Sequence, residues 1–345
     1  MTDSLTKRPG LPQLAASAAS YGRQVVCEAT RKRWAADWVK FQKWCDEYGL
    51  QSMPADPGTV ALFLAALADG NVKTEWIARH GEHREHQKPL KVCTIEHTYG
   101  SIIQAHKANG HDWPQAHPGI VRVMKGIRRR YGTKKKRAAP LLIADLKRCL
   151  ASLRERRYDD LVVVRNRCIL ALGWWGAFRR GEIVTLNVSD IEFVPEGMIV
   201  HLRRSKMDQE GAGFDKAIPF CADASCCAVK LTEEWLRRSE LKSGPLFRRI
   251  DPRSDAIGDK AMWPHVIRSL VKEVAEAAGV DPERLSGHSL RAGFITSAAQ
   301  AGKSLDDIMR HSGHKDERVA RSYIRHGTLF QNNAADGLGD EKEPK

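Results

Sequence analysis

Apolar residues in the first third of the chain recur at the spacing of amphipathic helices. "TRKRWAADWVKFQKWCDEYG", from Thr30, has apolar residues at positions 34, 38, 41 and 45, a basic first turn and a glycine where it stops. "DPGTVALFLAALADG" repeats this pattern between Pro57 and Gly70, and "TIEHTYGSIIQAHKANG" and "HPGIVRVMKGIRRR" follow it. Residues 21–130 are therefore predicted to form a small all-helical domain. Residues 1–20 are rich in Ser, Ala, Thr and Pro with little periodicity, and are predicted to be a flexible tail.

The pattern changes in the second part of the chain. Two helical stretches, "LLIADLKRCLASLRER" and the more apolar "VVRNRCILALGWWGAF", precede "GMIVHLRRSKMDQEGAGFDKAIPF". This last stretch alternates apolar and polar residues, turns through Gly211 and Gly213 and alternates again, which predicts a β-hairpin. Helical patterns dominate from residue 228 onward. The sequence thus predicts a second, mixed α+β domain over residues 140–325.

The two predicted domains are separated by a strongly basic run. Seven positive charges lie in "RRRYGTKKKRAAP", residues 128–140, and residues 131–139 are predicted to be a linker. The run fits a solvated linker and a linker that also follows phosphates equally well. Both interpretations remain open from the sequence.

The overall charge of the chain points to a polyanionic partner. The 345 residues include 56 Lys and Arg against 42 Asp and Glu, a formal charge of +14 at pH 7. Such an excess favours polyanions through counterion release and long-range attraction, so nucleic acid is the leading partner. Basic chains also bind anionic membranes, but no apolar run reaches the ~18 residues needed to span a bilayer, and the N-terminus lacks a signal-type apolar core. We therefore expect a soluble, cytoplasmic protein that associates with nucleic acid and has no membrane partner.

Cysteines and histidines raise the question of a metal site. Eight cysteines are scattered without the dense, even spacing of a disulfide scaffold, so reduced thiols are expected. Two clusters have metal-ligand residue types: the cysteines at 221, 226 and 227, and the three histidines of "RHGEHREHQ". The first has no CxxC pair, and the second has neither a suitable arrangement of partner carboxylates nor a second cluster, so no metal is expected. No GxxxxGK[ST] loop occurs, and no cofactor is expected.

Paired charged residues occur where a soluble core would not need them. "GWWGAFRRGEIVTL" spaces Arg179 and Glu182 three apart, so that the carboxylate can brace its neighbour on one helical face. "SGHSLRAGF" spaces His288 and Arg291 in the same way. Both would project from one face of a helical first turn, where backbone N–H groups also favour an anion. Taken singly, such pairs are usually ordinary surface contacts.

Three further groups complete an ordered set. Lys206, in "RRSKMDQEG", lies on or beside the predicted hairpin turn, and "HSGHKDERVARSYIRH" places His314 nine residues before Tyr323. A lone lysine in a turn is usually solubilising, and a lone tyrosine usually packs in a core. In this order, however, the set closely resembles the signature of the tyrosine recombinase family, the phage-integrase type, and especially its Cre-like members. "MPADPGTVALFLAALADG" and the helix before it also resemble the helical core-binding domain of Cre-like recombinases.

The resemblance implies a fold and a reaction. The fold is mainly α with two domains, an N-terminal helical core-binding (SAM-like) domain and a C-terminal mixed α+β catalytic domain with a small β-hairpin or sheet. The reaction is site-specific recombination, in which duplex DNA is cleaved and rejoined through a 3′-phosphotyrosyl intermediate and a Holliday junction, without metal or ATP.

The resemblance also implies a role for each residue of the set. Tyr323 is the nucleophile, and Arg179 and Arg291 hold the non-bridging phosphate oxygens. Lys206 protonates the leaving 5′-oxygen. The remaining members are auxiliary: the histidines bind the phosphate or assist proton transfer, and the glutamate braces the cluster, at His288, His314 and Glu182.

Further residues are expected to bind DNA. Those that open two helices of the first domain are candidates for base or phosphate contacts, and those in and before the linker for backbone contacts: Lys32, Arg33, Lys91, Thr94, His97, Arg128, Lys134 and Lys136. The partner implied is double-stranded DNA with an inverted-repeat recombination site, bound by a homotetramer that is a monomer in solution. Residues 326–345 fit either a loose acidic tail or a segment that packs on a neighbouring subunit.

One departure from the family pattern and two other functions remain. Residues 71–90 are longer than the matching turn of Cre-like proteins, and a solvated polar insertion is expected there. A type IB topoisomerase-like nicking and resealing enzyme would use the same residues on one strand. A DNA-binding regulator that has lost catalysis would carry a broken catalytic position, and none is broken here.

Overall fold

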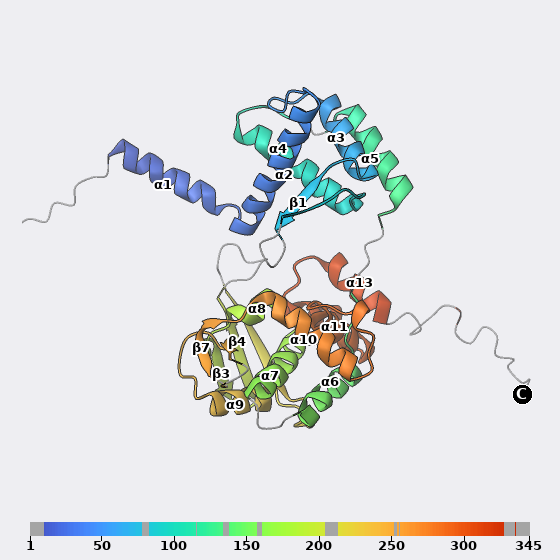
Figure 1. The fold of residues 1–345 in the computed structure, drawn as a ribbon. Coiled ribbons are helices and arrows are strands. Elements are labelled where there is room, and N and C mark those ends of the chain that lie inside the picture. Colours follow the sequence, from blue (N-terminus) through green and yellow to red (C-terminus); the bar gives the residue numbers. More distant parts are fainter. Residues whose placement is uncertain are drawn as a thin grey trace, which may run out of the picture. The chain divides into compact units, whose positions relative to one another are not determined.

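The chain divides into two compact units, Met1–Lys135 and Lys136–Lys345 (Figure 1). The division falls inside the segment predicted as a linker, and the other predicted domain limits stay predictions. The computed structural model describes residues 10–77, 83–114, 116–133, 138–156, 161–203, 213–251, 254, 256–327 and 335.

The first unit contains the four helices that the sequence predicts, and their bounds are α2 Glu28–Glu47, α3 Pro57–Asp69, α4 Val92–Ala108 and α5 Pro118–Tyr131. α2 packs on α4 and α3 packs on α5, around a core that includes Phe41, Phe63 and Ile95. Local chemistry sets the ends of α3, because the Asp56 side chain accepts a 2.7 Å hydrogen bond from a backbone N–H and Gly70 adopts a left-handed φ of 79°.

Two elements of the first unit were not predicted. The expected tail over residues 1–20 contains part of a helix, α1 Leu11–Gln24, in which Gln13 caps the backbone N–H of Gly10 at 3.0 Å. Its Ala-rich sequence has high helix propensity even though its apolar residues lack a core-facing stripe. The expected polar insertion at residues 71–90 contains two antiparallel strands, β1 Thr74–Ile77 and β2 His83–His86. Backbone pairing forms such a ribbon without the apolar alternation that a half-buried strand shows.

The second unit contains the predicted hairpin within a three-stranded antiparallel sheet of order β3-β4-β5. Its strands are β3 Ile191–Val194, β4 Gly197–Leu202 and β5 Phe214–Pro219. One face of the sheet is buried and carries Met198, Val200 and Ile218. A separate antiparallel pair consists of β6 Arg248–Ile250 and β7 Ile257–Ala261.

Helices make up most of the second unit. Their bounds are α6 Ile143–Arg156, α7 Leu161–Trp175, α8 Arg180–Thr185, α9 Ala228–Ser239, α10 Pro264–Ala277, α11 Ser289–Gln300, α12 Leu305–Ser312 and α13 Glu317–Gly327, with short 3₁₀ turns at Val188–Asp190 and Pro282–Arg284. With the small sheets, this is the mainly α, two-unit fold that the sequence predicts.

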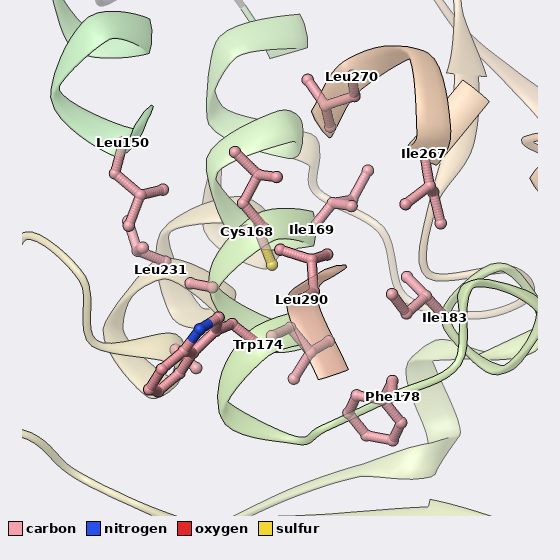
Figure 2. Close-up of a cluster of buried hydrophobic side chains, with 14 of the residues drawn as sticks. Leu150, Cys168, Ile169, Trp174, Phe178, Ile183, Leu231, Ile267, Leu270 and Leu290 are labelled. Carbon is pink, nitrogen blue, oxygen red and sulfur yellow. The ribbon is translucent and has the colours of Figure 1, made fainter. Parts of the chain in front are cut away.

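Helix α7 lies at the centre of the second unit and contacts α6, α9, α10 and α11. Figure 2 shows Cys168, Ile169 and Trp174 of α7 among apolar side chains from these neighbours. An α-helix that is apolar all round is stable only when it is enclosed in this way. The buried helix therefore gives a rigid base to the turn that follows it at Gly176. Among the described residues, no helix is long and apolar enough to cross a membrane.

Candidate active site

The turn between α7 and α8 carries the first pair of candidate residues. Ala177 has a left-handed φ of 47°, and Phe178 is fully buried. Arg179 follows at the N-terminal end of α8, and its backbone N–H donates to Glu182 Oε2 at 2.8 Å. Its guanidinium Nη1 donates to the other oxygen, Oε1, at 2.6 Å. The buried carboxylate of Glu182 thus holds both the backbone and the side chain of Arg179.

Arg291, in the first turn of α11, reaches the same turn from the opposite side. Its side chain is buried, and Nη1 donates to the carbonyl of Ala177 at 2.7 Å. Nη2 lies 3.2 Å from both ring nitrogens of His314. Burial and the nearby charge of Arg179 lower the pKa of Arg291 to about 10, so the guanidinium is still charged at neutral pH.

His314 stands just beyond the C-terminus of α12, after Gly313 has ended that helix with a left-handed φ of 69°. Ser312 Oγ lies 2.7 Å from His314 Nδ1 and fixes the ring orientation. Burial, followed by the charges of Arg291 and Arg179, lowers the pKa of His314 to about 3. The imidazole is therefore neutral at pH 7, with one ring nitrogen that donates and one that accepts a hydrogen bond.

Tyr323 lies on α13, which packs against α11 and α12. Its ring is half-buried on a small apolar cluster that contains Ile295, Ala299 and Ile308. The ring centroids of Tyr323 and His314 are 6.1 Å apart. The tyrosine is thus both a packing residue and a neighbour of the cationic groups.

The structure brings together five of the seven predicted catalytic residues, Arg179, Glu182, Arg291, His314 and Tyr323. They come from three separate stretches of the chain, at 179–182, 291 and 314–323. His288 forms the N-terminal cap of α11 and is exposed, and its backbone N–H donates to Ser286 Oγ at 3.1 Å. Lys206 lies outside the described residues.

Two residues of this region escaped the sequence analysis. His311 Nε2 donates to the carbonyl of Trp175 at 2.6 Å, and its ring stacks on Phe294 at a centroid distance of 4.5 Å. Burial lowers the pKa of His311 to about 4. Lys216, on β5, is 2% exposed and lies behind the turn that carries Arg179. The alternation of "FDKAIP" signals the second residue, because it places the lysine on the same face as Phe214 and Ile218.

The comparisons with known proteins agree with this geometry. The model of the phage integrase family matches residues 144–328, which hold the whole cluster. The chain belongs to this family. It is 34% identical over 308 residues to the integrase/recombinase xerD homolog of Selenomonas ruminantium, which covers 88% of this chain and 84% of that protein. It is 25% identical over 354 residues to recombinase cre of Escherichia phage P1, with 94% and 95% covered.

Solved structures show the same fold. XerH recombinase bound to palindromic difH substrate, in a post-cleavage complex, superposes with a TM-score of 0.55 at 17% identity, covering 72% of this chain and 68% of that one. A lambda integrase dimer bound to a COC′ core site gives 0.53 at 14% identity, covering 99% and 85%. This phage-integrase family member is therefore a tyrosine recombinase, an enzyme of site-specific DNA recombination.

The predicted DNA-binding residues that the structure describes lie on the surface of the first unit. The described members are exposed and belong to α2, to α4 with its N-terminal cap, and to α5: Lys32, Arg33, Lys91, Thr94, His97 and Arg128. Two of them already have acidic partners, since Lys32 Nζ lies 2.7 Å from Glu28 and Arg128 Nε lies 2.9 Å from Glu96. Lys134 and Lys136 lie outside the described residues, as does most of the segment 326–345. Across the described part of the chain, no group of three or more His, Cys, Asp or Glu side chains is arranged to hold a metal ion.

Proposed function

We propose that this recombinase cleaves and rejoins duplex DNA through a covalent link between Tyr323 and the 3′-phosphate, and that strand exchange passes through a Holliday junction. The observation that supports the proposal most strongly is the convergence of two guanidinium groups and a neutral imidazole beside one tyrosine. Burying such charged and polar groups would destabilise an ordinary apolar core. Beside a phosphodiester they can supply the nucleophile, the cations that stabilise negative charge and a hydrogen-bonding group.

The two arginines supply the main electrostatic stabilisation. Attack by an oxygen nucleophile concentrates negative charge on the non-bridging oxygens of the phosphate, and fixed cations placed there stabilise the transition state. A guanidinium offers paired donors and keeps its charge, as Arg291 does even with its pKa lowered to about 10. Glu182 holds Arg179 and Ala177 O holds Arg291, so neither group must be ordered when DNA arrives.

The chemical step moves one proton at each end. The Tyr323 oxygen forms a bond to phosphorus, and the bond from phosphorus to the 5′-oxygen breaks. The phenolic proton passes to solvent. The pKa of His314, lowered to about 3, makes its imidazole a weak base, so His314 serves as a neutral hydrogen-bonding partner of the phosphate. The leaving 5′-oxygen takes a proton from Lys206, and the exposed His288 contacts the phosphate. Because the phosphotyrosyl ester conserves the energy of the original bond, attack by a 5′-hydroxyl reseals the strand without ATP or a metal.

The test is covalent trapping on a nicked suicide substrate that carries the cognate site, itself found by selecting bound fragments from a random library. Labelled DNA is incubated in EDTA with the wild type, with Tyr323→Phe, and with the matched control Tyr131→Phe, whose hydroxyl bonds Asp69 in the first unit. A denaturing gel is expected to show a protein–DNA band for the wild type and the control alone. Tight binding with no covalent band would instead support a regulator without catalysis.

The proposed assembly is four subunits on two inverted-repeat sites, with one subunit on each repeat. The first unit supplies exposed basic residues for base or phosphate contacts, and the linker adds backbone contacts. Sedimentation of the free protein is expected to give a monomer, and addition of the site to give two subunits per duplex and then a tetramer. A product confined to nicked and resealed single strands would point to topoisomerase-like activity.

A further inference from the structure

Lys216 occupies a position where a sheet normally carries an apolar residue. It pairs with Val200 across the β4–β5 ladder and lies on the buried face with Ile218. Only 2% of the residue is exposed. An ammonium group in such a place costs stability unless its hydrogen bonds are filled, and an apolar side chain of similar volume is often at least as stable. A lysine here therefore calls for a reason other than stability.

The Nζ of Lys216 donates to two backbone carbonyls from distant parts of the chain. One is Gly176 O, at 2.8 Å, and the other is His311 O, at 2.6 Å. The rings of Phe178 and Phe214 flank the amine, with centroids 5.1 Å and 5.4 Å away. Since a neutral amine still has two N–H donors, both bonds survive loss of the proton.

These two carbonyls belong to the two segments that carry the site. Gly176 is followed by Ala177, whose carbonyl holds Arg291, and then by Arg179. His311 is followed by Ser312, which orients the His314 ring. The His311 side chain links the same segments a second time, through its bond to Trp175 O. From the buried face of the sheet, Lys216 thus joins the turn of residues 176–179 to the C-terminal end of α12.

We propose that Lys216 is a positioning residue, which sets the distance between the arginine-bearing turn and the histidine-bearing end of α12 without touching DNA. The inference rests on the proposed function, because the groups it positions are those assigned there to the phosphate. Burial, with Arg291 and Arg179 nearby, lowers the pKa of Lys216 to about 7, so the amine is charged only part of the time at neutral pH and its repulsion toward the two arginines is reduced, while both hydrogen bonds persist.

The first test removes the two donors and keeps the volume. Lys216→Met is expected to fold at least as stably as the wild type, to bind the site with unchanged affinity and to form the covalent complex about 10- to 100-fold more slowly in single turnover. The matched control is Ile218→Val, a buried residue of the same strand and face, which removes core volume and no donor. It is expected to cleave at the wild-type rate. Cleavage by Lys216→Met at that rate would overturn the proposal.

A second measurement separates positioning from proton donation. A 5′-bridging phosphorothiolate gives a thiolate leaving group that needs no proton, because thiols have a pKa of about 8.5. This substrate is expected to leave the slow cleavage by Lys216→Met uncorrected. Full recovery would make Lys216 the general acid and sink the positioning role. Lys216→Arg, which keeps charge and donors, is expected to retain more activity than Lys216→Met, and equal loss would count against the proposal.

A third measurement does not depend on catalysis. Hydrogen–deuterium exchange of Lys216→Met is expected to quicken in peptides that cover residues 172–182 and 308–316 and to stay unchanged in β3 and β4. If the wild type forms no covalent complex, the proposed function is wrong. The exchange pattern still tests whether Lys216 links the turn of residues 176–179 to the end of α12. Exchange that quickens throughout the second unit would show a general loss of stability and would refute a positioning role.

Discussion

Loss of Glu182 should lower both stability and catalysis, since its two oxygens hold the backbone and the side chain of Arg179 at 2.8 and 2.6 Å. Glu182→Ala leaves a partly buried guanidinium without its acceptor. We expect a loss of about 1–3 kcal/mol in the free energy of unfolding. We also expect slower formation of the covalent complex, because the arginine is no longer fixed before DNA binds.

Glu234 offers a control for that substitution. Its carboxylate pairs with the buried Arg167 at 3.6 Å, away from the cluster. Glu234→Ala should lower the urea midpoint while the single-turnover rate is unchanged. If both variants slowed cleavage in proportion to their lost stability, Glu182 would have no special role in positioning Arg179.

His311 should make the second unit sensitive to acid. Its pKa is lowered to about 4 by burial, whereas an unfolded histidine has a pKa near 6.5, so below that pH the unfolded chain binds the extra proton. The contribution of neutral His311 to the free energy of unfolding is therefore fully present above about pH 6.5. It is lost as the pH falls toward 4, by roughly 3 kcal/mol. Urea unfolding between pH 4.5 and 7.5 should show a smaller pH dependence for His311→Gln, which keeps a donor for Trp175 O.

At the scale of single residues, the sequence identified the site residues that occur in a known order along the chain. It missed the two whose role depends on buried tertiary contacts. Arg179, Glu182, Arg291, His314 and Tyr323 were named because their order along the chain resembles the signature of the tyrosine recombinase family, and the structure brings them together. The contacts of Lys216 and His311 depend on carbonyls 40 and 136 residues away along the chain. No local pattern encodes such partners, although the alternation of β5 placed the lysine inward.

Among the elements, α11 depends on a glycine for its close packing. A Cβ on Gly293 would lie 1.8 Å from the carbonyl oxygen of Leu141, so this helix could not keep its place with a larger residue. Gly293→Ala should destabilise the second unit by about 1–3 kcal/mol or more and displace Arg291. Thermal unfolding and covalent trapping would report the two effects.

Gly126 is the matched position for that experiment. It also lies inside a helix, α5, but nothing stands within 4 Å of its built Cβ. Gly126→Ala should therefore raise the free energy of unfolding of the first unit by about 0.5–1 kcal/mol, from helix propensity alone. Similar behaviour of the two variants would contradict the tight contact at Gly293.

The elements that the sequence predicted are those with both a regular hydrophobic periodicity and residues that mark where the element begins or ends. α3 has Asp56 and Pro57 at its start and Gly70 at its end, and the structure confirms it. α1 lacks a core-facing stripe, and the β1–β2 ribbon lacks apolar alternation, so neither pattern was visible. Strand β3 was missed because it is only four residues long and its pairing with β4 is not local information.

For the whole molecule, the formal charge of +14 predicts DNA binding that weakens steeply with salt. The logarithm of the affinity should fall linearly with the logarithm of salt concentration, with a slope of about −0.9 per phosphate neutralised. Lys91→Ala should reduce the magnitude of the slope by about one, because Lys91 is exposed at the start of α4 and is proposed to bind DNA. Lys230→Ala, an exposed lysine of α9 with no proposed contact, should leave it unchanged.

The two-unit organisation was predictable because composition changes sharply at the basic run, and the division between residues 135 and 136 lies there. The proposed contacts with DNA do not follow from composition in the same way. Charge at the surface gives the partner class, while the choice of individual phosphates depends on geometry that neither spacing nor composition contains.

The left-handed conformation of Ala177 has a consequence for any attempt to improve this enzyme. An alanine at a φ of 47° is strained, and glycine would relieve that strain at no steric cost. A selection for heat resistance alone would therefore favour glycine at this position. The same change would make the carbonyl that accepts the Arg291 hydrogen bond more mobile, so the more heat-stable protein would be the slower recombinase.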